Sequence, residues 1–167
     1  MNPFSVELAK FKEEIYLVQN DIKSAYYERA IARLNELVIL HPSQAEPLYE
    51  LGKMAYNFWR NDEAEDFYIR ALKADPAYFP TYTQYALILI KAQRFDEAEG
   101  LLESSKKLIN REDADIYFYY GMLYQHKGQL ENAISSYKSA INVSINESQI
   151  DLNLKFIRAC IELRGWE

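Results

Sequence analysis

The feature that most constrains the fold is a pattern of residue types that recurs every 34 or 35 residues. Its most regular member is a small residue, found at Ala30, Ala64, Ala98 and Ala133. A larger residue follows four positions later, at Leu34, Tyr68, Leu102 and Tyr137. A fixed offset between matching residue types is typical of stacked repeats, each of which is one supersecondary unit. The chain therefore predicts four copies of one unit.

The stretch from Ala45 to Pro76 shows what one unit contains. Two amphipathic helical segments are joined by a short polar turn and closed by the proline, which cannot continue a helix. The residues that mark the unit are Leu51, Gly52, Ala55, Ala64, Tyr68, Ala71 and Pro76. On these residue types and spacings the chain resembles the tetratricopeptide repeat family, a helix–turn–helix unit, over about residues 11–147. The first repeat departs most, since Val18 and Asp21 replace the usual small and aromatic residues.

The resemblance implies an all-α fold, a right-handed superhelix of four helix pairs with a C-terminal cap helix. We expect a single domain over residues 1–167, with repeats at about 11–44, 45–78, 79–113 and 114–147 and the cap helix at about 148–164. The composition, with 49% hydrophobic and 26% charged residues, is that of an ordinary globular domain.

The C-terminal segment carries an apolar stripe at helical spacing. It consists of Ile150, Leu154, Ile157 and Ile161. Such a stripe predicts a helix that covers the open end of a repeat stack. Further apolar residues widen this face, at Leu152, Phe156, Leu163 and Trp166. A homodimer through the C-terminal helix is therefore the alternative.

The sequence contains few residues in arrangements that are typical of catalytic sites. Its two histidines, His41 and His126, lie more than two repeats apart, which does not favour a shared metal site or a catalytic pair. The single cysteine, Cys160, has the character of a small packed residue and fits a reducing compartment. Glycine-rich phosphate loops and His-Glu metal motifs are missing from the sequence. We expect no enzyme activity, no cofactor and no metal.

The net charge and the hydropathy pattern argue against further classes of protein. A net charge of −6 argues against a general nucleic-acid-binding protein, which needs a clustered basic surface. The N-terminal residues lack the apolar core of a signal peptide, and no apolar stretch is long enough to span a membrane. We therefore expect a cytoplasmic protein.

The resemblance also indicates where a partner would bind. In this family the first helix of each pair lines the concave side of the superhelix. On that face the predicted partner-binding residues are Tyr16, Tyr49, Lys53, Tyr56, Gln84, Leu87, Phe118, Tyr119 and Met122. The same face takes in Ile15, Glu46, Glu50 and Ile90. Large aromatic side chains are typical anchors at interfaces, and the near balance of charges favours a partner of mixed apolar and polar character.

The 14 tyrosines divide between this face and the core. The predicted packing tyrosines are Tyr27, Tyr68, Tyr82, Tyr85, Tyr117, Tyr120, Tyr124 and Tyr137. The alternative for those on the binding face is that neighbouring groove residues simply stack on one another.

One subfamily can be tested on the sequence. Tetratricopeptide domains that bind the acidic tails of heat-shock chaperones use a clamp of lysine, asparagine and arginine. The matching places here hold Ile15, Gln19, Glu50, Pro80 and Gln84, or, shifted by one repeat, Tyr49, Lys53, Gln84, Asp115 and Tyr119. Only Lys53 is basic, so the clamp is absent.

We therefore interpret the chain as a protein–protein interaction module, an adaptor or assembly scaffold, that binds a peptide or helix of another protein. One alternative is a secretion-type chaperone, although the extra N-terminal helical segment usual in that group is missing. The other is a structural module that assembles with itself through Trp166 and the cap helix.

Overall fold

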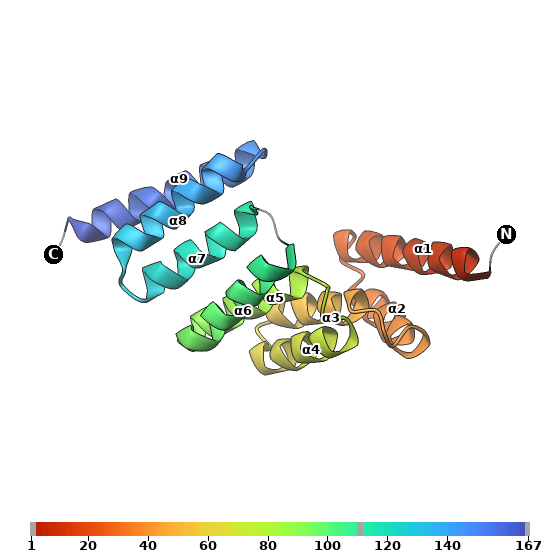
Figure 1. Cartoon of the computed structure of the whole chain (residues 1–167). Helices are drawn as coiled ribbons and strands as arrows, with labels where there is room; N and C mark the ends of the chain where they lie inside the picture. Colours follow the sequence, from red (N-terminus) through yellow and green to blue (C-terminus); the bar gives the residue numbers. More distant parts are fainter. Residues whose placement is uncertain (1–2, 110–111, 166–167) are drawn as a thin grey trace. The chain divides into compact units, whose positions relative to one another are not determined.

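The computed structural model describes residues 3–109 and 112–165, and all its regular elements there are α-helices (Figure 1). They are α1 Pro3–Lys23, α2 Tyr27–Leu40, α3 Glu46–Asn57, α4 Asn61–Ala74, α5 Pro80–Lys91, α6 Phe95–Ile109, α7 Ala114–His126, α8 Leu130–Val143 and α9 Glu147–Arg164. The predicted all-α class of four helix pairs and a closing helix is confirmed. Trp166, predicted to act in self-assembly, lies outside the described residues.

The chain divides into two compact units, Met1–Tyr78 and Phe79–Glu167. Unit 1 holds the first two helix pairs, α1–α2 and α3–α4. Unit 2 holds α5–α6, α7–α8 and α9, and in it α8 packs against both α7 and α9 (Figure 1).

The contact inside each helix pair depends on two registered positions. The first-helix position holds Val18, Gly52, Ala86 and Gly121. The second-helix position holds Leu34, Tyr68, Leu102 and Tyr137, all fully buried. Glycine thus faces tyrosine in the second and fourth pairs. The first and third pairs have valine or alanine at the first position and leucine at the second. The glycine in the second and fourth pairs leaves room for the larger tyrosine ring between the two helices.

The two glycines are required by this close approach. A Cβ atom at Gly52 would lie 2.5 Å from Cε1 of Tyr68, and one at Gly121 would lie 2.4 Å from Cε1 of Tyr137. Both distances are far below van der Waals contact, so any other residue would push the tyrosine ring and the second helix away.

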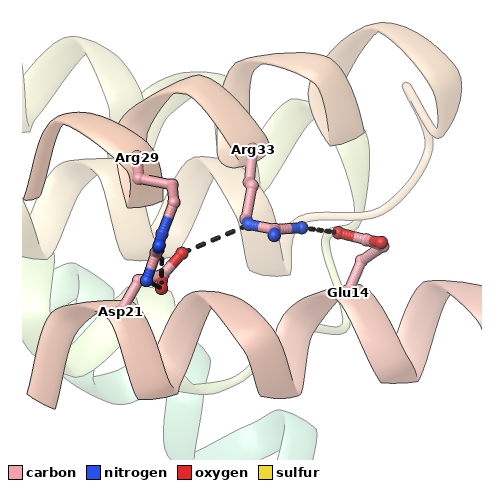
Figure 2. A network of polar contacts seen from close by, with 4 residues as sticks. All are labelled: Glu14, Asp21, Arg29 and Arg33. Atoms are coloured by element: carbon pink, nitrogen blue, oxygen red, sulfur yellow. Dashed lines mark hydrogen bonds and ion pairs between the residues drawn. The ribbon is translucent and has the colours of Figure 1, made fainter. Parts of the chain in front are cut away.

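The first helix pair is joined by a network of charges in addition to its apolar packing. Figure 2 shows Asp21 and Glu14 of α1 facing Arg29 and Arg33 of α2. Asp21 is buried and accepts hydrogen bonds from Arg29, with Nε at 2.8 Å, and from Nε of Arg33 at 3.2 Å. Nη1 of Arg33 also donates to Glu14 at 2.7 Å. The hydrogen bond from Arg29 is the main reason that the pKa of Asp21 is lowered. The atypical Asp21 is thus satisfied by two guanidinium groups.

The turn inside each helix pair repeats a single backbone conformation. Its central residue has a positive φ in every pair: 59° at Ala25, 61° at Trp59, 60° at Gln93 and 74° at Gly128. The next residue closes the turn by donating its N–H to a carbonyl five residues earlier, as in Arg60 to Ala55 at 2.9 Å. This bond is the helix-ending pattern that favours glycine at the positive-φ position. Only the fourth pair uses glycine there.

The orientation of α9 differs from the prediction. The buried face consists of Asn153, Ile157 and Cys160, whereas Leu154 and Ile161 of the predicted stripe are exposed. The helix is turned so that Phe156 packs on Phe118 and Tyr137, with ring centroids 5.3 Å from each. The aromatic contact, rather than the most regular aliphatic stripe, fixes which side of α9 is buried.

Candidate partner-binding site

The first helices of unit 1 present a charged and aromatic surface, which we call the unit 1 face. It consists of Tyr16, Glu46, Tyr49, Glu50, Lys53 and Tyr56. Tyr16 is the most accessible of them, with 62% of its surface exposed on α1. Tyr49, Lys53 and Tyr56 are half-buried on α3. The remaining two members are carboxylates, and their surroundings are unusual.

The carboxylate of Glu50 is buried and held by Lys53, whose Nζ lies 3.0 Å from Oε1 and 3.1 Å from Oε2. The same ammonium group lies 5.1 Å from the centre of the Tyr49 ring, within the range of a cation–π contact. Lys53 therefore joins an acidic and an aromatic member of the face into one cluster.

Glu46 lies one helical turn before Glu50. Burial raises the pKa of Glu46, and the negative charge of Glu50 raises it further, while Lys12 and Lys53 oppose the shift. Tyr78, which lies against Tyr49 at 5.5 Å between ring centroids, also has a raised pKa, mainly through burial. Two carboxylates and two phenol groups thus lie in one partly buried cluster.

The first helices of unit 2 present an uncharged surface, the unit 2 face, made of Gln84, Leu87, Phe118, Tyr119 and Met122. Gln84 of α5 donates from Nε2 to the hydroxyl oxygen of Tyr119 at 2.7 Å, which links α5 to α7. Tyr119 is only 9% exposed. Leu87 is half-buried at the position that Lys53 occupies one repeat earlier.

Phe118 and Met122 belong partly to the core of unit 2. Both pack against the buried cluster of Ala133, Tyr137, Ile157 and Cys160. The ring centroid of Phe118 lies 5.8 Å from that of Tyr137 and 5.4 Å from that of Tyr119. Only part of each side chain is therefore accessible to a partner.

The structure places Lys53 beside Tyr49, Gln84 on Tyr119 and Phe118 beside Tyr119, and it corrects other predictions. Ile15 and Ile90, predicted on the binding face, are buried in the helix packing. Tyr27, predicted as a packing residue, is 40% exposed. Tyr78, which lies against Tyr49, was missed by the prediction.

Two further findings on the described residues concern metal ions and membrane-spanning helices. No group of three or more His, Cys, Asp or Glu side chains in residues 3–109 and 112–165 is arranged to hold a metal ion. None of the helices described is long and apolar enough to cross a bilayer. Cys160 is buried, and burial raises the pKa of its thiol, which disfavours the reactive thiolate.

Comparison with known proteins agrees with the repeat pattern. Two family models described as tetratricopeptide repeat match residues 20–79 and residues 114–144. The chain belongs to the tetratricopeptide repeat family. A search of curated protein sequences finds none that matches this chain.

Solved structures of the same fold cover most of the chain. MamA from Desulfovibrio magneticus RS-1, from residue 41 to its end, has 20% sequence identity and a TM-score of 0.65, over 95% of this chain and 97% of that one. The first tetratricopeptide domain of Spaghetti (RPAP3), bound to the HSP90 peptide SRMEEVD, has 23% identity and a TM-score of 0.62, over 73% of this chain and 94% of that one. At these identities the likeness establishes the fold alone.

Proposed function

We propose that this protein is a protein-binding adaptor or assembly scaffold, and that its partner contributes a peptide or helix that docks on the first helices. The tetratricopeptide fold supports a protein–protein interaction role in general. The particular surface is proposed from the side chains of the unit 1 and unit 2 faces.

The observation that carries the proposal is the cluster of Glu46, Glu50, Lys53 and Tyr49 on α3. Placing the half-buried carboxylate of Glu46 one turn from the buried carboxylate of Glu50 disfavours ionised Glu46, whose pKa is raised by burial and by the charge of Glu50. The stability of the fold does not require this cluster of charged side chains on the face of α3. Clusters of ionisable residues with shifted pKa values are enriched at functional sites.

The chemistry of the two faces supports a partner of mixed character. The unit 1 face offers the ammonium group of Lys53, carboxylates and tyrosine rings, which suit a segment with polar groups of both charges. The unit 2 face offers Leu87, Met122 and an amide, which suit an uncharged, partly apolar segment. An acidic peptide such as that bound by the RPAP3 domain is a poor fit, because Lys53 is the one basic residue of the unit 1 face and is already paired with Glu50.

Several predicted anchors take a supporting role in this proposal. Tyr119 positions Gln84 through its hydroxyl group, and Phe118 supports the aromatic cluster beneath the unit 2 face. Direct contact is assigned to Tyr16, Lys53, Leu87 and Met122. The compartment we propose is the reducing cytoplasm, where a single cysteine such as Cys160 stays unpaired.

Site-specific photo-crosslinking tests the proposal. A benzophenone amino acid is placed at position 16, 53 or 87, and the protein is irradiated in a lysate of the cells that produce it. The matched controls carry the same probe at positions 103 and 138, which are exposed on the second helices α6 and α8. We expect one protein to be crosslinked from the first-helix positions and not from the controls. Crosslinking of that protein only from positions 103 and 138 would overturn the proposal.

A further inference from the structure

A second surface of unit 1 lies at the turns of its two helix pairs, away from the cluster on α3. It contains four aromatic residues, Tyr26, Tyr27, Phe58 and Trp59, which we call the aromatic turn patch. Their exposed fractions run from 40% for Tyr27 to 86% for Trp59. The two turns meet through Tyr27 and Phe58, whose ring centroids are 5.2 Å apart in an edge-to-face arrangement.

Trp59 is the most unusual residue of the patch. It holds the positive-φ position of its turn, at 61°, where a bulky side chain is conformationally disfavoured. The other repeats place Ala25, Gln93 and Gly128 at the same position. With 86% of its surface exposed, the indole gains little burial in return. Folding therefore gives no reason for a tryptophan here, and binding does.

The charges around the patch are balanced within it. The guanidinium group of Arg29 stacks 4.6 Å from the centre of the Tyr26 ring and is paired with Asp21. Arg60 lies 6.0 Å from the centre of the Phe58 ring and pairs with Glu63 at 3.5 Å. Nucleic acid and anionic lipid are drawn to surfaces with an excess of positive charge, and this one has none.

The aromatic side chains of the patch offer the indole N–H of Trp59, which only donates, and two phenol hydroxyls, which can donate or accept. The guanidinium groups beside them are already paired, Arg29 with Asp21 and Arg60 with Glu63. The complementary partner is uncharged, rich in acceptors and poor in donors. A polyproline II helix has this chemistry, since its carbonyl groups are exposed, its prolines have no N–H and their rings pack against aromatic side chains.

We propose that the aromatic turn patch binds a proline-rich segment of another protein in the polyproline II conformation. The segment lies across the two turns, with its prolyl rings on Trp59 and Phe58 and its carbonyls accepting from the indole and phenol groups. Because such a segment is already extended before it binds, little conformational entropy is lost on docking. This surface is separate from the first-helix faces, so it stands or falls independently of the function proposed above.

The test uses a fluorescein-labelled peptide of ten prolines and a glycine–serine peptide of the same length as control. Fluorescence anisotropy with the full-length protein should show binding of the proline peptide alone. Trp59→Gln should weaken that binding by about tenfold or more, the effect of losing a hot-spot residue. Glutamine is the matched substitution because Gln93 already occupies this turn position at a φ of 60°. Gln93→Gly, at the corresponding turn of unit 2, should leave the affinity unchanged.

A thermal melt separates binding from a structural role. Trp59→Gly should raise Tm by about 2–4 °C, because glycine relieves the positive-φ conformation, while it abolishes peptide binding. A fall in Tm would show that the indole supports the fold and would overturn the proposal. Equal binding of both peptides, or an affinity unchanged in Trp59→Gln, would also overturn it. Two further outcomes would overturn the proposal. In the first, the wild-type protein binds phosphatidylcholine–phosphatidylserine vesicles and Trp59→Gln abolishes that binding. In the second, the mass of the wild-type protein rises with its concentration and that of Trp59→Gln does not.

Discussion

The first-helix faces of the two units use the same repeat positions for different chemistry. Glu50 in unit 1 corresponds to Gln84 and Tyr119 in unit 2, and Lys53 corresponds to Leu87 and Met122. In unit 1 these positions form an ion pair against a tyrosine ring, whereas in unit 2 they form a neutral hydrogen bond beside apolar side chains. The helix packing beneath is nearly the same, with Gly52 against Tyr68 and Gly121 against Tyr137. A constant framework therefore carries surfaces that vary position by position.

The largest expected effect tests the shared framework. Gly52→Ala and Gly121→Ala should each lower the free energy of unfolding by about 1–3 kcal/mol, because the added Cβ would overlap a buried tyrosine ring. Chemical denaturation followed by circular dichroism measures both losses.

Gly100→Ala provides the matched control for these variants. A Cβ at Gly100 would meet nothing within 4 Å, and the residue lies inside α6. The substitution should stabilise the protein by about 0.5–1 kcal/mol through helix propensity. A large loss at one of Gly52 and Gly121 with none at the other would break the equivalence of the two units.

The charged contact of the first helix pair should make unit 1 sensitive to acid. The folded-state pKa of Asp21 is lowered, so its contribution to stability is complete above the unfolded pKa of about 3.9 and is lost as pH falls through the lower folded value. Asp21→Asn should lower Tm by several degrees at pH 7, and the gap to the wild type should narrow as pH falls below about 4. A gap that stays constant between pH 4 and pH 2 would show that the carboxylate charge is not the cause.

The two faces should differ in their response to salt. Lys53→Ala should weaken binding of the crosslinked partner less at 0.5 M than at 0.05 M sodium chloride, because screening already reduces the contribution of exposed charges. Leu87→Ala should weaken binding by a factor that salt leaves nearly unchanged, about tenfold or less for one truncated aliphatic contact. Isothermal titration calorimetry at both salt concentrations gives the two factors. Equal salt responses would remove the distinction between the faces.

The smallest effect concerns Glu46. Its folded-state pKa is raised, so the ionised carboxylate opposes folding above that pKa, and the opposition disappears as pH falls through it. Glu46→Gln should therefore be neutral or stabilising at pH 7, by about 0.5 kcal/mol or less, and should make no difference near pH 4. Denaturation curves at the two pH values measure this. A loss of stability at pH 7 would show that Glu46 has a structural role.

Much of the fold could be predicted because it depends on local rules. The recurrence of Ala64 and Tyr68 at a fixed offset is enough to indicate the repeat, and the small residues at the helix contacts follow from packing. The site was harder to predict because exposure depends on neighbours far along the chain. Tyr119 fell on the correct helix face, yet its hydroxyl bonds Gln84, 35 residues away, and its ring is nearly covered.

The orientation of α9 shows the same limit. Apolar residues occupy more than half of its circumference, so periodicity alone could not tell which of several stripes is buried. The position was decided by the packing of Phe156 on Phe118 and Tyr137. The prediction that Tyr27 packs in the core was wrong for a related reason, because its ring lies against Phe58 at an exposed turn.

The most direct test of the proposed function is the affinity of the crosslinked partner for two triple variants of equal helicity. One variant, Tyr16→Ala/Lys53→Ala/Leu87→Ala, removes contacts from the first-helix faces. The other, Asp62→Ala/Glu103→Ala/Lys138→Ala, changes exposed residues of the second helices α4, α6 and α8. We predict a loss of about a hundredfold or more for the first variant and no change for the second. Wild-type affinity in the first variant, or a loss confined to the second, would contradict binding at the first-helix faces.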